Sequence, residues 1–345
     1  MAQPGLVTTT PSIFTEHRAD IEEEMRQILS PYSGEVYKML KYHLGWVKPN
    51  GAPDSSNSGK MIRPSLCLHA YHAVTGRWKE ALPAAAALEL VHNFSLIHDD
   101  IQDHDKERRH RKTVWAIWGE SQGINTGDAM AFLSNVAMSS LWDTAITHNK
   151  IRRAYQLFNT ATLEMIEGQT MDLIFERRAE VGPQEYMSMI SKKTGALLRC
   201  SLELGATLGS DDTKTIESFR KAGENVGLAF QIKDDMLGIW GDEKLTGKPF
   251  ASDVHRKKKS LPVVIALAGP GGRHLKSIYS KKRLSGRDVR QVLNIMDENG
   301  VEAICRAKLD NSCSDAQKNI ARVNVHGKAR ESFEQMLSFL MERGY

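Results

Sequence analysis

The sequence has little of several features that mark large protein classes. Its 345 residues contain only four cysteines, Cys67, Cys200, Cys305 and Cys313, with no CxxC pair and no histidines at metal-ligand spacing. We therefore expect buried, reduced thiols rather than disulfides or a zinc site. No stretch approaches the roughly 20 consecutive apolar residues that a bilayer-spanning helix needs. The formal net charge of +4 is too small to indicate a nucleic-acid partner, so we expect a soluble cytoplasmic protein.

Runs of alternating β-branched residues between turn signals are also nearly absent, so a sheet is hard to place. Helical signals dominate instead, because windows such as 151–173, 186–208 and 215–237 have apolar residues every three or four positions. With 41% hydrophobic residues, the chain can bury a large core. We predict an all-α protein with a flexible N-terminal tail over residues 1–15 and a single helical domain over residues 16–345.

The first motif that suggests chemistry is an acidic cluster in "LIHDDIQDHDKERRHRK". Asp99, Asp100 and Asp103 have the spacing D-D-x-x-D. Residues three and four apart share one face of a helix, so these carboxylates lie within about one turn and repel each other. A solvated acidic helix end would give the same pattern. A hard divalent cation such as Mg²⁺, shared with phosphate oxygens, would instead make the cluster favourable.

A second acidic motif favours the metal interpretation. "FQIKDDMLGIWGD" again sets an aspartate pair, Asp234 and Asp235, after an apolar helical run. The two pairs are too far apart in the chain to lie on one helix. Two helices that face each other across a cavity could bring them together.

Basic residues accompany both acidic motifs. An Arg side chain binds phosphate oxygens through two parallel hydrogen bonds, and Lys adds a point charge. Each cation alone fits an ordinary surface position, but together they match two diphosphate groups, one held through metal ions and one by basic side chains. These cations are Lys60 and Arg63 in "GKMIRP", Arg108 and Arg109 after the first motif, Lys193 in "SKKTGAL", and Lys248 and residues 257–259 in "TGKPFASDVHRKKKSLP".

The motifs, in this order from about Gly59 to Pro262, resemble those of the trans-isoprenyl (polyprenyl) diphosphate synthases. "RRHRKTVW", "EGQTMDL" and the "GD" of Gly127 and Asp128 also match. The resemblance implies an antiparallel helical bundle around a deep central cavity, usually as a homodimer. It also implies a short-chain prenyltransferase that condenses isopentenyl diphosphate with an allylic diphosphate.

The resemblance further assigns roles to site residues. Three Mg²⁺ ions, for which Mn²⁺ can substitute, would be held by Asp99, Asp100, Asp103, Asp234 and Asp235. The allylic diphosphate would be contacted by Lys193, Lys258 and Arg108. The isopentenyl diphosphate would be held by Lys60, Arg63 and Arg109, and Lys248 would be a further substrate-binding residue. The allylic cation would be surrounded by Thr194, Gln231, Gln169 and Asp172.

Product length in this family depends on how far the growing chain can extend below the metal site. Ser95, Phe94, Val91 and Leu88 precede Asp99 on the same predicted helix and would line that path. At 1.5 Å rise per residue, Phe94 lies about 7.5 Å from Asp99 along the helix axis. An aromatic residue at this position resembles synthases of C20 or C15 products, and we favour C20. Ordinary core packing of Phe94 is the alternative.

Two places depart from the family pattern. Gly238 stands where many members have a third aspartate in the second motif. We expect this loss to weaken the second metal site, although Asp242, four residues later, could substitute for it in part. His110 and Lys112 stand where the family commonly has Gly and Pro, beside the Arg pair. Either departure could alter the chemistry.

Two rival functions follow from the same motifs. A terpene cyclase on the same scaffold would keep the metal-binding aspartates but would not need the isopentenyl-binding cations Lys60, Arg63 and Arg109. A non-catalytic subunit of a heteromeric synthase would be expected to lose the first acidic motif, which is complete here. Chain elongation is therefore the favoured prediction, with the cyclase as the alternative.

Overall fold

The structure is a computed structural model that describes residues 10–54, 59–243 and 249–342. These residues are helical apart from loops, one isolated bridge and one hairpin of two-residue strands, so the predicted all-α class is confirmed. None of the described helices combines the length and the apolar character that crossing a membrane requires. In chain order the elements are η1 (Ser12–Phe14), α1 (Arg18–Leu29), α2 (Glu35–His43), α3 (Ile62–Thr75), η2 (Lys79–Ala81), α4 (Leu82–Gln102), β1 (Glu107–Arg108), β2 (Arg111–Lys112), α5 (Val114–Trp118), α6 (Glu120–Ser139), η3 (Ser140–Asp143), α7 (His148–Arg177), α8 (Pro183–Ile190), η4 (Ser191–Gly195), α9 (Ala196–Gly209), α10 (Thr213–Trp240), α12 (Ser252–His255), α13 (Leu261–Ala268), α14 (Gly272–Tyr279), α15 (Gly286–Glu298), α16 (Val301–Ala321) and α17 (Ala329–Glu342).

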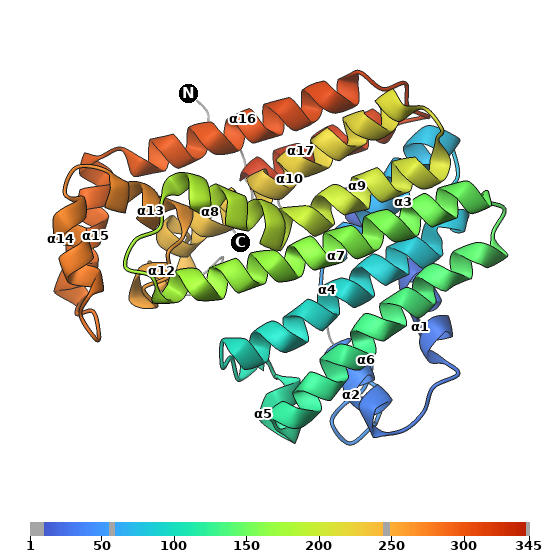
Figure 1. Ribbon diagram of the computed structural model, residues 1–345, viewed down its shortest axis with the longest axis horizontal. Coiled ribbons are helices and arrows are strands. Elements are labelled where there is room, and N and C mark those ends of the chain that lie inside the picture. Colours follow the sequence, from blue (N-terminus) through green and yellow to red (C-terminus); the bar gives the residue numbers. More distant parts are fainter. Residues whose placement is uncertain (1–9, 55–58, 244–248, 343–345) are drawn as a thin grey trace.

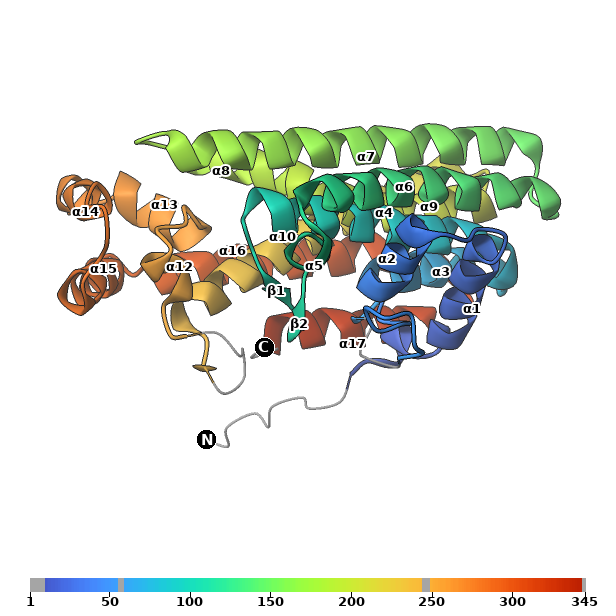
Figure 2. The same ribbon diagram turned by 90° about the horizontal axis from the view of Figure 1, so that it is seen from below.

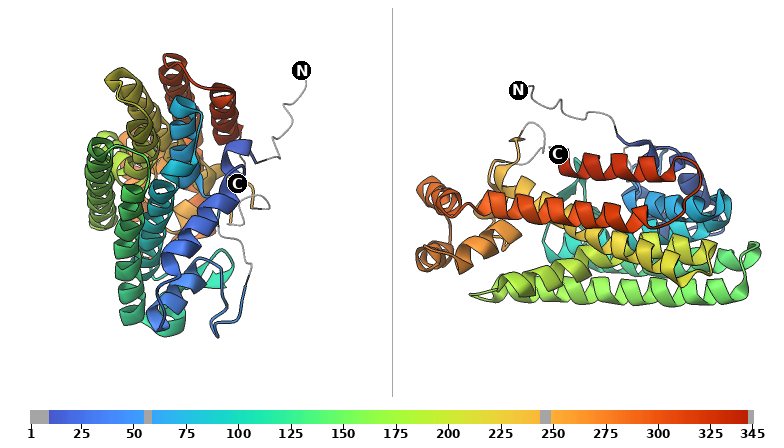
Figure 3. Two further views of the ribbon diagram at one scale, coloured as in Figure 1. Left: turned by 90° about the vertical axis from the view of Figure 1, so that its right-hand side faces the viewer. Right: turned by 90° about the horizontal axis from the view of Figure 1, so that it is seen from above.

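The long helices lie lengthwise beside one another and form a bundle (Figure 1). Their connections alternate between the two ends of the bundle, so successive long helices run in opposite directions. α4 packs on α6, α9 packs on α3 and α10, and α16 packs on α10. α14 and α15 stand across one end of the bundle (Figure 2), and the end-on view shows the layered helices (Figure 3). The expected antiparallel bundle is confirmed.

Local sequence explains where two of these helices begin. Asp212 caps α10, because its carboxylate accepts hydrogen bonds from the backbone N–H groups of Lys214 (3.2 Å) and Thr215 (3.1 Å). Ser285 and Asp288 form a capping box at the start of α15. The cap on α10 fixes the start of the helix that carries the second acidic motif.

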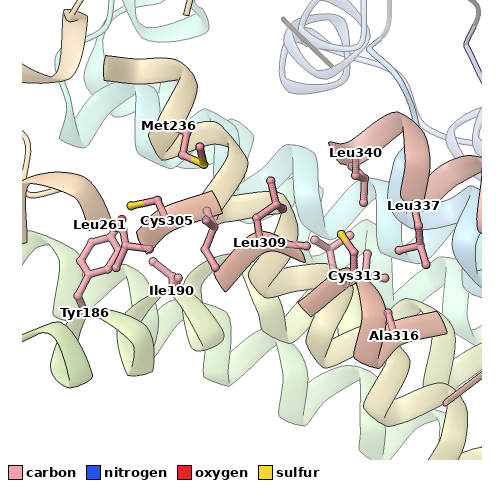
Figure 4. Packing of buried hydrophobic residues seen from close by; sticks show 14 of the residues in the cluster. Tyr186, Ile190, Met236, Leu261, Cys305, Leu309, Cys313, Ala316, Leu337 and Leu340 are labelled. Atoms are coloured by element: carbon pink, nitrogen blue, oxygen red, sulfur yellow. The ribbon is translucent and has the colours of Figure 1, made fainter. Parts of the chain in front are cut away.

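The apolar core follows helical periodicity. On α16, Cys305, Leu309, Cys313 and Ala316 recur every three or four residues and pack in one cluster with Met236 of α10 (Figure 4). α4 is buried over most of its length because it lies inside the bundle. All four cysteines are buried and unpaired, which confirms the expected reduced thiols.

Part of the segment expected to be a flexible tail is packed instead. Residues 1–9 lie outside the described part of the chain, but η1 brings Ile13 (6% exposed) and Phe14 (1% exposed) into the core. Phe14 meets the edge of the Phe339 ring at 6.2 Å between centroids, and η1 contacts α3 and α17. The predicted end of the tail at residue 15 is therefore wrong, because two large apolar side chains gain more from burial than the segment loses in freedom.

Candidate active site

Two adjoining cavities lie between α4, α7, η4 and α10. The first has a volume of about 400 Å³ and is lined largely by charged and polar side chains, including Asp99, Arg108, Asp172, Tyr186, Lys193, Gln231, Asp234, Asp253 and Lys258. The second has a volume of about 480 Å³ and a more apolar wall, including Phe94, Ala131, Met165, Ile166, Leu173 and Leu197. Asp99, Leu96 and Lys193 line both, so they mark the junction. We call the two spaces the polar cavity and the apolar cavity.

The first acidic motif lies at the C-terminal end of α4. Asp103 follows Asp99 by one turn, and its backbone N–H donates to the Asp99 carbonyl (2.8 Å). Burial raises the pKa of Asp99 to about 6; Asp103 and Asp172 raise it further, while Lys193 and Arg108 oppose the shift. Burial likewise raises the pKa of Asp103. These carboxylates therefore stand in a place where an added cation would be favourable.

Asp100 has a different environment from its neighbour. Only 2% of the residue is exposed, and its Oδ1 accepts a hydrogen bond from Nε of Arg108 at 2.7 Å. Arg108 in turn lines the polar cavity. The structure thus turns Asp100 towards Arg108, and Asp100 orients a cation rather than facing the cavity itself.

The two aspartates of the second motif also differ. Asp234 lines the polar cavity opposite Asp99, whereas Asp235 is 0% exposed. The Asp235 carboxylate accepts hydrogen bonds from the Tyr186 hydroxyl, the Leu261 backbone N–H (2.9 Å) and Nε2 of Gln231 (2.9 Å). The structure therefore does not bring Asp235 to the cavity wall, and its oxygens are already occupied within the protein.

Asp235 also fixes two residues predicted to surround the allylic cation. It holds the amide of Gln231, and Oε1 of Gln231 accepts a hydrogen bond from the Thr194 hydroxyl at 2.6 Å. Gln231 lines the polar cavity and Thr194 lines the apolar one. Their oxygens are thus set on either side of the junction by a chain of hydrogen bonds.

Lys193 reaches the junction because the helix locally widens into a π-turn. η4, with the sequence SKKTG, is a π-helical segment between α8 and α9, and such turns are frequent at functional sites. Gly168 of α7 makes room for it, since a Cβ there would lie 2.6 Å from the Lys193 Cα. The Lys193 ammonium group pairs with Asp172, also on α7.

Lys258 lines the polar cavity from the segment after α12. Burial disfavours its charged form, but the carboxylates of Asp235, Asp253, Asp172 and Asp234 outweigh this and raise the pKa of Lys258. The ammonium group is therefore charged at neutral pH. It can pair with an anionic ligand on the α10 side of the cavity.

Arg63, Lys60 and Arg109, the cations expected to hold the diphosphate of isopentenyl diphosphate, do not all lie at the cavities. Arg63 lines the apolar cavity, and its buried Nε has no hydrogen-bond partner among the described residues. Burial lowers the pKa of Arg63 to about 10, although the nearby carboxylates of Glu89 and Asp234 act in the opposite direction and raise it. Lys60 and Arg109 are not among the residues that line either cavity. The Lys60 ammonium group lies 5.4 Å from the Phe339 ring centroid, and Arg109 packs against Gly59.

The turn beside the Arg pair explains one departure from the family pattern. β1 and β2 pair through Arg108 and Arg111, and the two residues between them, Arg109 (φ 52°) and His110 (φ 61°), are left-handed. Glycine adopts this conformation at the lowest cost. His110 adopts it here, and the Lys112 carbonyl accepts a hydrogen bond from the Tyr42 hydroxyl at 2.8 Å.

The apolar cavity differs from expectation at its inner end. Phe94 and Ser95 line it as predicted. Val91 and Leu88 are 1% and 0% exposed and lie in the core instead of the cavity wall. They lie on the same face of α4 as Ser95 but one and two turns further from Asp99, where the described cavity does not extend, so their role in limiting chain length stays a prediction. The wall comes from α7 instead, through Met165, Ile166 and Leu173.

Gln169 and Lys248 complete the predicted set. Gln169 lines the apolar cavity and donates to Gln102 across it at 2.8 Å, while its own buried Oε1 has no partner among the described residues. Lys248 lies outside the described residues. Sequence reasoning missed Tyr186 and Asp253, which line the polar cavity. Tyr186 gave no signal, whereas Asp253 lies within the motif "TGKPFASDVHRKKKSLP".

The donor set fits divalent metal ions only together with a substrate. Across the described chain, no three His, Cys, Asp or Glu side chains come together as a ready-made metal site. Mg²⁺ usually keeps several waters and is bound through one or two carboxylates plus substrate phosphates. Hard carboxylate oxygens stand on both sides of the polar cavity, Asp99 and Asp234, with cations around them. This arrangement matches that requirement.

Comparisons with known proteins agree with this geometry. The sequence signature of the polyprenyl synthetase family matches residues 53–296. The chain is 34% identical over 341 residues to the (2E,6E)-farnesyl diphosphate synthase of Mycobacterium tuberculosis, covering 97% of this chain and 93% of that protein. It is 40% identical over 250 residues to the geranylgeranyl diphosphate synthase of the same organism, covering 72% and 70%. The crystal structure of a polyprenyl synthetase from Streptomyces coelicolor has a TM-score of 0.87 at 33% identity and covers 95% of this chain and 98% of its own.

The fold and the two-sided acidic cavity define the class of isoprenoid synthases. The chain belongs to the polyprenyl synthetase family. The predicted resemblance to short-chain trans-isoprenyl diphosphate synthases and the predicted enzyme class, a prenyltransferase, are thereby confirmed.

Proposed function

We propose that the protein condenses isopentenyl diphosphate with an allylic diphosphate to give a linear short-chain product. The observation that carries this proposal is the junction of the two cavities at Asp99 and Lys193. A diphosphate in the polar cavity would place its hydrocarbon chain in the apolar one. Relatives named for farnesyl and geranylgeranyl diphosphate support the same class of product.

The metal ligands that we propose are Asp99 and Asp103 on α4 and Asp234 on α10. Three Mg²⁺ ions, with Mn²⁺ as a substitute, would supply positive charge that stabilises the departing diphosphate. Asp100 and Asp235 position neighbouring side chains and do not bind metal themselves. Each is hydrogen-bonded to a residue that lines the polar cavity, Asp100 to Arg108 and Asp235 to Gln231. This assignment replaces the expectation that all five aspartates bind metal.

Protein side chains carry the rest of the ionisation step. Lys193, Lys258 and Arg108 bind the leaving diphosphate, since all three line the polar cavity. The oxygens of Thr194 and Gln231 stabilise the allylic cation without bonding to it covalently. The apolar walls exclude water, which would otherwise quench the cation.

The second substrate enters on the α3 side. Arg63 binds the diphosphate of isopentenyl diphosphate through its Nε, which has no hydrogen-bond partner among the described residues. Lys60, which follows Gly59 in the chain, and Arg109, which packs against Gly59, add positive charge for the same diphosphate. The double bond of isopentenyl diphosphate attacks the allylic cation. The released diphosphate then takes the proton lost from the new chain.

A second copy of the chain is the proposed partner, and the cytoplasm is the proposed location. α6 and α7 lie on one side of the bundle (Figure 3) and expose Ile124 (47%), Phe132 (75%), Leu163 (62%) and Ile166 (43%). Apolar side chains this exposed, on helices that line the cavities, fit a self-complementary interface. Sedimentation of the wild-type chain at about twice 38.6 kDa supports the homodimer; a monomer refutes it.

The test is a product assay. Purified protein with Mg²⁺ and isopentenyl diphosphate is incubated with dimethylallyl, geranyl or farnesyl diphosphate, and products are identified by mass and chromatography. We expect linear diphosphates up to C20, with C15 as the shorter possibility, only when isopentenyl diphosphate is present. A cyclic hydrocarbon or alcohol from the allylic substrate alone would show the terpene cyclase instead.

A further inference from the structure

One short part of the chain carries a large excess of positive charge. Residues 256–290 contain eleven Lys and Arg residues and one acidic residue, Asp288, although the whole chain has a formal net charge of only +4. The second half of this segment forms α14, the loop 280–285 and the start of α15, and the two helices stand across one end of the bundle (Figure 2). Charge concentrated in this way produces a local field that attracts an anionic partner to this end.

α14 and α15 each have a packed side and a charged side. α14 buries Leu275 and Ile278, and α15 buries Val289 and Val292, in the same core cluster. The cations of the two helices and of their loop are exposed to solvent; these are Arg273, Lys281, Lys282, Arg283, Arg287 and Arg290. Because the apolar sides are already covered, the two helices can hold a partner chiefly through charge.

A recess beside α14 continues this charged surface. It has a volume of about 230 Å³ and lies between the end of α7, the segment 257–259 and α14. Its charged lining consists of one acidic residue, Glu176, and the cations Arg178, Lys257, Lys259 and Lys276. Nζ of Lys257 donates a hydrogen bond to the Lys281 carbonyl at 2.6 Å, so the recess adjoins the loop that carries exposed cations. We call the six exposed cations and this recess the basic face.

The lysines of the recess are hydrogen-bonded to backbone carbonyls. The Lys259 ammonium group contacts the carbonyls of Phe175, Glu176 and Arg178 at the end of α7. Burial lowers the pKa of Lys259, and Arg178 and Lys257 lower it further, while Glu176 acts in the opposite direction. A phosphate group in the recess would therefore stabilise the charged form of these side chains.

We propose that the basic face docks on the surface of an anionic lipid bilayer, with a phosphate headgroup in the recess. Clusters of Lys and Arg on a helical surface are typical of binding to anionic lipids. The inference goes beyond the proposed function but is compatible with it, since a prenyl diphosphate is an amphiphile whose hydrocarbon chain partitions into a bilayer. The basic face is formed by other helices than α6 and α7, which expose the apolar residues of the proposed dimer.

Two observations favour a bilayer over a nucleic acid as the partner. Tyr279 is the single Phe, Tyr or Trp in residues 273–290, and its hydroxyl is buried, so this segment offers no exposed ring that could stack on bases. Phe250 (51% exposed) lies just before α12, and Ile304 (41% exposed) lies in the first turn of α16; both helices contact α15. Exposed apolar side chains next to a basic surface suit the boundary between headgroups and acyl chains.

The test is co-sedimentation of the full chain with lipid vesicles in the absence of substrates. The probe is a vesicle of phosphatidylglycerol and phosphatidylcholine in equal parts, and vesicles of phosphatidylcholine alone are the neutral comparison. We expect the wild type to bind the anionic vesicles and not the neutral ones. It should be largely released at about 0.5 M salt, where the Debye length is under about 5 Å. Equal binding to neutral vesicles would overturn the proposal.

A triple variant tests whether the basic face is the surface that binds. Lys282→Gln, Arg283→Gln and Arg287→Gln together remove three exposed charges, so the fold should be kept. We expect binding to the anionic vesicles to fall by on the order of 10- to 100-fold, because each Lys or Arg near an anionic bilayer adds to the attraction.

The matched control removes the same charge from the opposite end of the bundle. Lys214→Gln, Arg322→Gln and Lys328→Gln change exposed residues at the start of α10, just after α16 and just before α17, and these helix ends lie far from α14 and α15 (Figure 1). The control should bind like wild type. An equal loss of binding in the control would show that only net charge matters, and would refute the basic face as the docking surface.

The recess is tested by Lys276→Gln. Lys276 lines the recess and pairs with the exposed Glu180 at 2.6 Å. We expect binding to the phosphatidylglycerol vesicles to weaken by about fivefold, and binding to vesicles in which oleate supplies the same surface charge to weaken less. Equal losses with the two kinds of vesicle would refute a phosphate headgroup in the recess.

A nucleic acid partner is tested with a short DNA duplex at the same salt concentration. If the wild type binds the duplex more tightly than the anionic vesicles, and the triple variant loses that binding, the bilayer proposal is overturned in favour of a nucleic acid. If the wild type binds neither, the proposal is overturned outright.

The outcomes separate docking from the proposed function. The triple variant should elongate substrates in solution like wild type, since Lys282, Arg283 and Arg287 line neither the polar nor the apolar cavity. A wild type that elongates substrates but does not bind anionic vesicles refutes docking alone. A wild type that binds the vesicles but does not elongate refutes the proposed function alone.

Discussion

At the scale of single residues, neighbouring aspartates with the same sequence signal have different surroundings. Asp99 and Asp234 line the polar cavity, whereas Asp100 faces Arg108 and Asp235 is hydrogen-bonded on all sides. Successive helical residues point about 100° apart, so only one of each pair can face the same cavity. The sequence identified both pairs, but their division of roles depends on the packing of α8 and α13 around Asp235.

Substitutions in the second pair should separate the two roles. The Asp235 carboxylate accepts hydrogen bonds from the Tyr186 hydroxyl, the Gln231 amide and the Leu261 backbone N–H. In Asp235→Asn the new NH₂ group must face at least one of these donors, so that hydrogen bond is lost and the free energy of unfolding should fall by about 1 to 3 kcal/mol. Asp234→Asn should cost less stability than Asp235→Asn, because Asp234 lines the cavity, while elongation activity falls by on the order of 100-fold. Denaturant unfolding and turnover of both variants give the comparison. Equal stability losses in the two would contradict this division.

The pH dependence of stability should show the cost of placing Asp99 at the site. Its pKa is raised to about 6 in the folded protein from 3.8, so the ionised form is disfavoured on folding. Relative to Asp99→Asn, the metal-free wild type should be less stable at pH 7 by about 3 kcal/mol. This deficit should shrink as pH falls through 6 towards 4. A difference that stays constant from pH 7 to 4 would refute the raised pKa.

At the scale of elements, the π-turn η4 is what the sequence could not predict. The sequence predicts a functional motif at "SKKTGAL", yet its periodicity is that of an ordinary helix. The extra residue in the turn is stabilised by contacts distant in sequence: Gly168 of α7 and Gly227 of α10 both approach its backbone closely. The hairpin with His110 was missed for a related reason, since two-residue strands carry too little pattern to detect.

Gly168→Ala should test how α7 positions η4. The new Cβ would meet the backbone of Lys193, which cannot rotate away, so α7 and η4 must separate. We expect a loss of about 1 to 3 kcal/mol in stability and a fall in turnover larger than any change in KM for isopentenyl diphosphate. Gly286→Ala is the matched control, since nothing lies within 4 Å of a Cβ there. A fully active, stable Gly168→Ala would show that the close approach is dispensable.

At the scale of the whole molecule, the class of fold and the pairing of two distant motifs could be predicted, because helical periodicity and charge patterns are local signals. The shape of the apolar cavity could not. Val91 and Leu88 have the same spacing as lining residues, but neighbouring helices cover them. Which face of α4 borders the cavity depends on α6 and α7, and no local signal encodes that choice.

The cavity as a whole should set product length, with Phe94 as its largest side chain on α4. Phe94→Ala removes a wall residue and should lengthen the product by one or more C5 units, as read by mass spectrometry. Val91→Ala is the matched control, because it is buried one turn away and does not line the cavity. It should destabilise the fold by about 1 to 3 kcal/mol without a change in length. An unchanged product from Phe94→Ala would remove Phe94 from chain-length control.

The most direct measurement is a crystal structure with Mn²⁺ and an unreactive allylic diphosphate analogue, with the ions located by anomalous scattering. The account predicts Mn²⁺ between Asp99 and Asp103 on α4 and Asp234 on α10, all bridged by one diphosphate, with the hydrocarbon chain running past Leu96 towards Phe94. Ions bound elsewhere, or a hydrocarbon chain lying outside the apolar cavity, would contradict it.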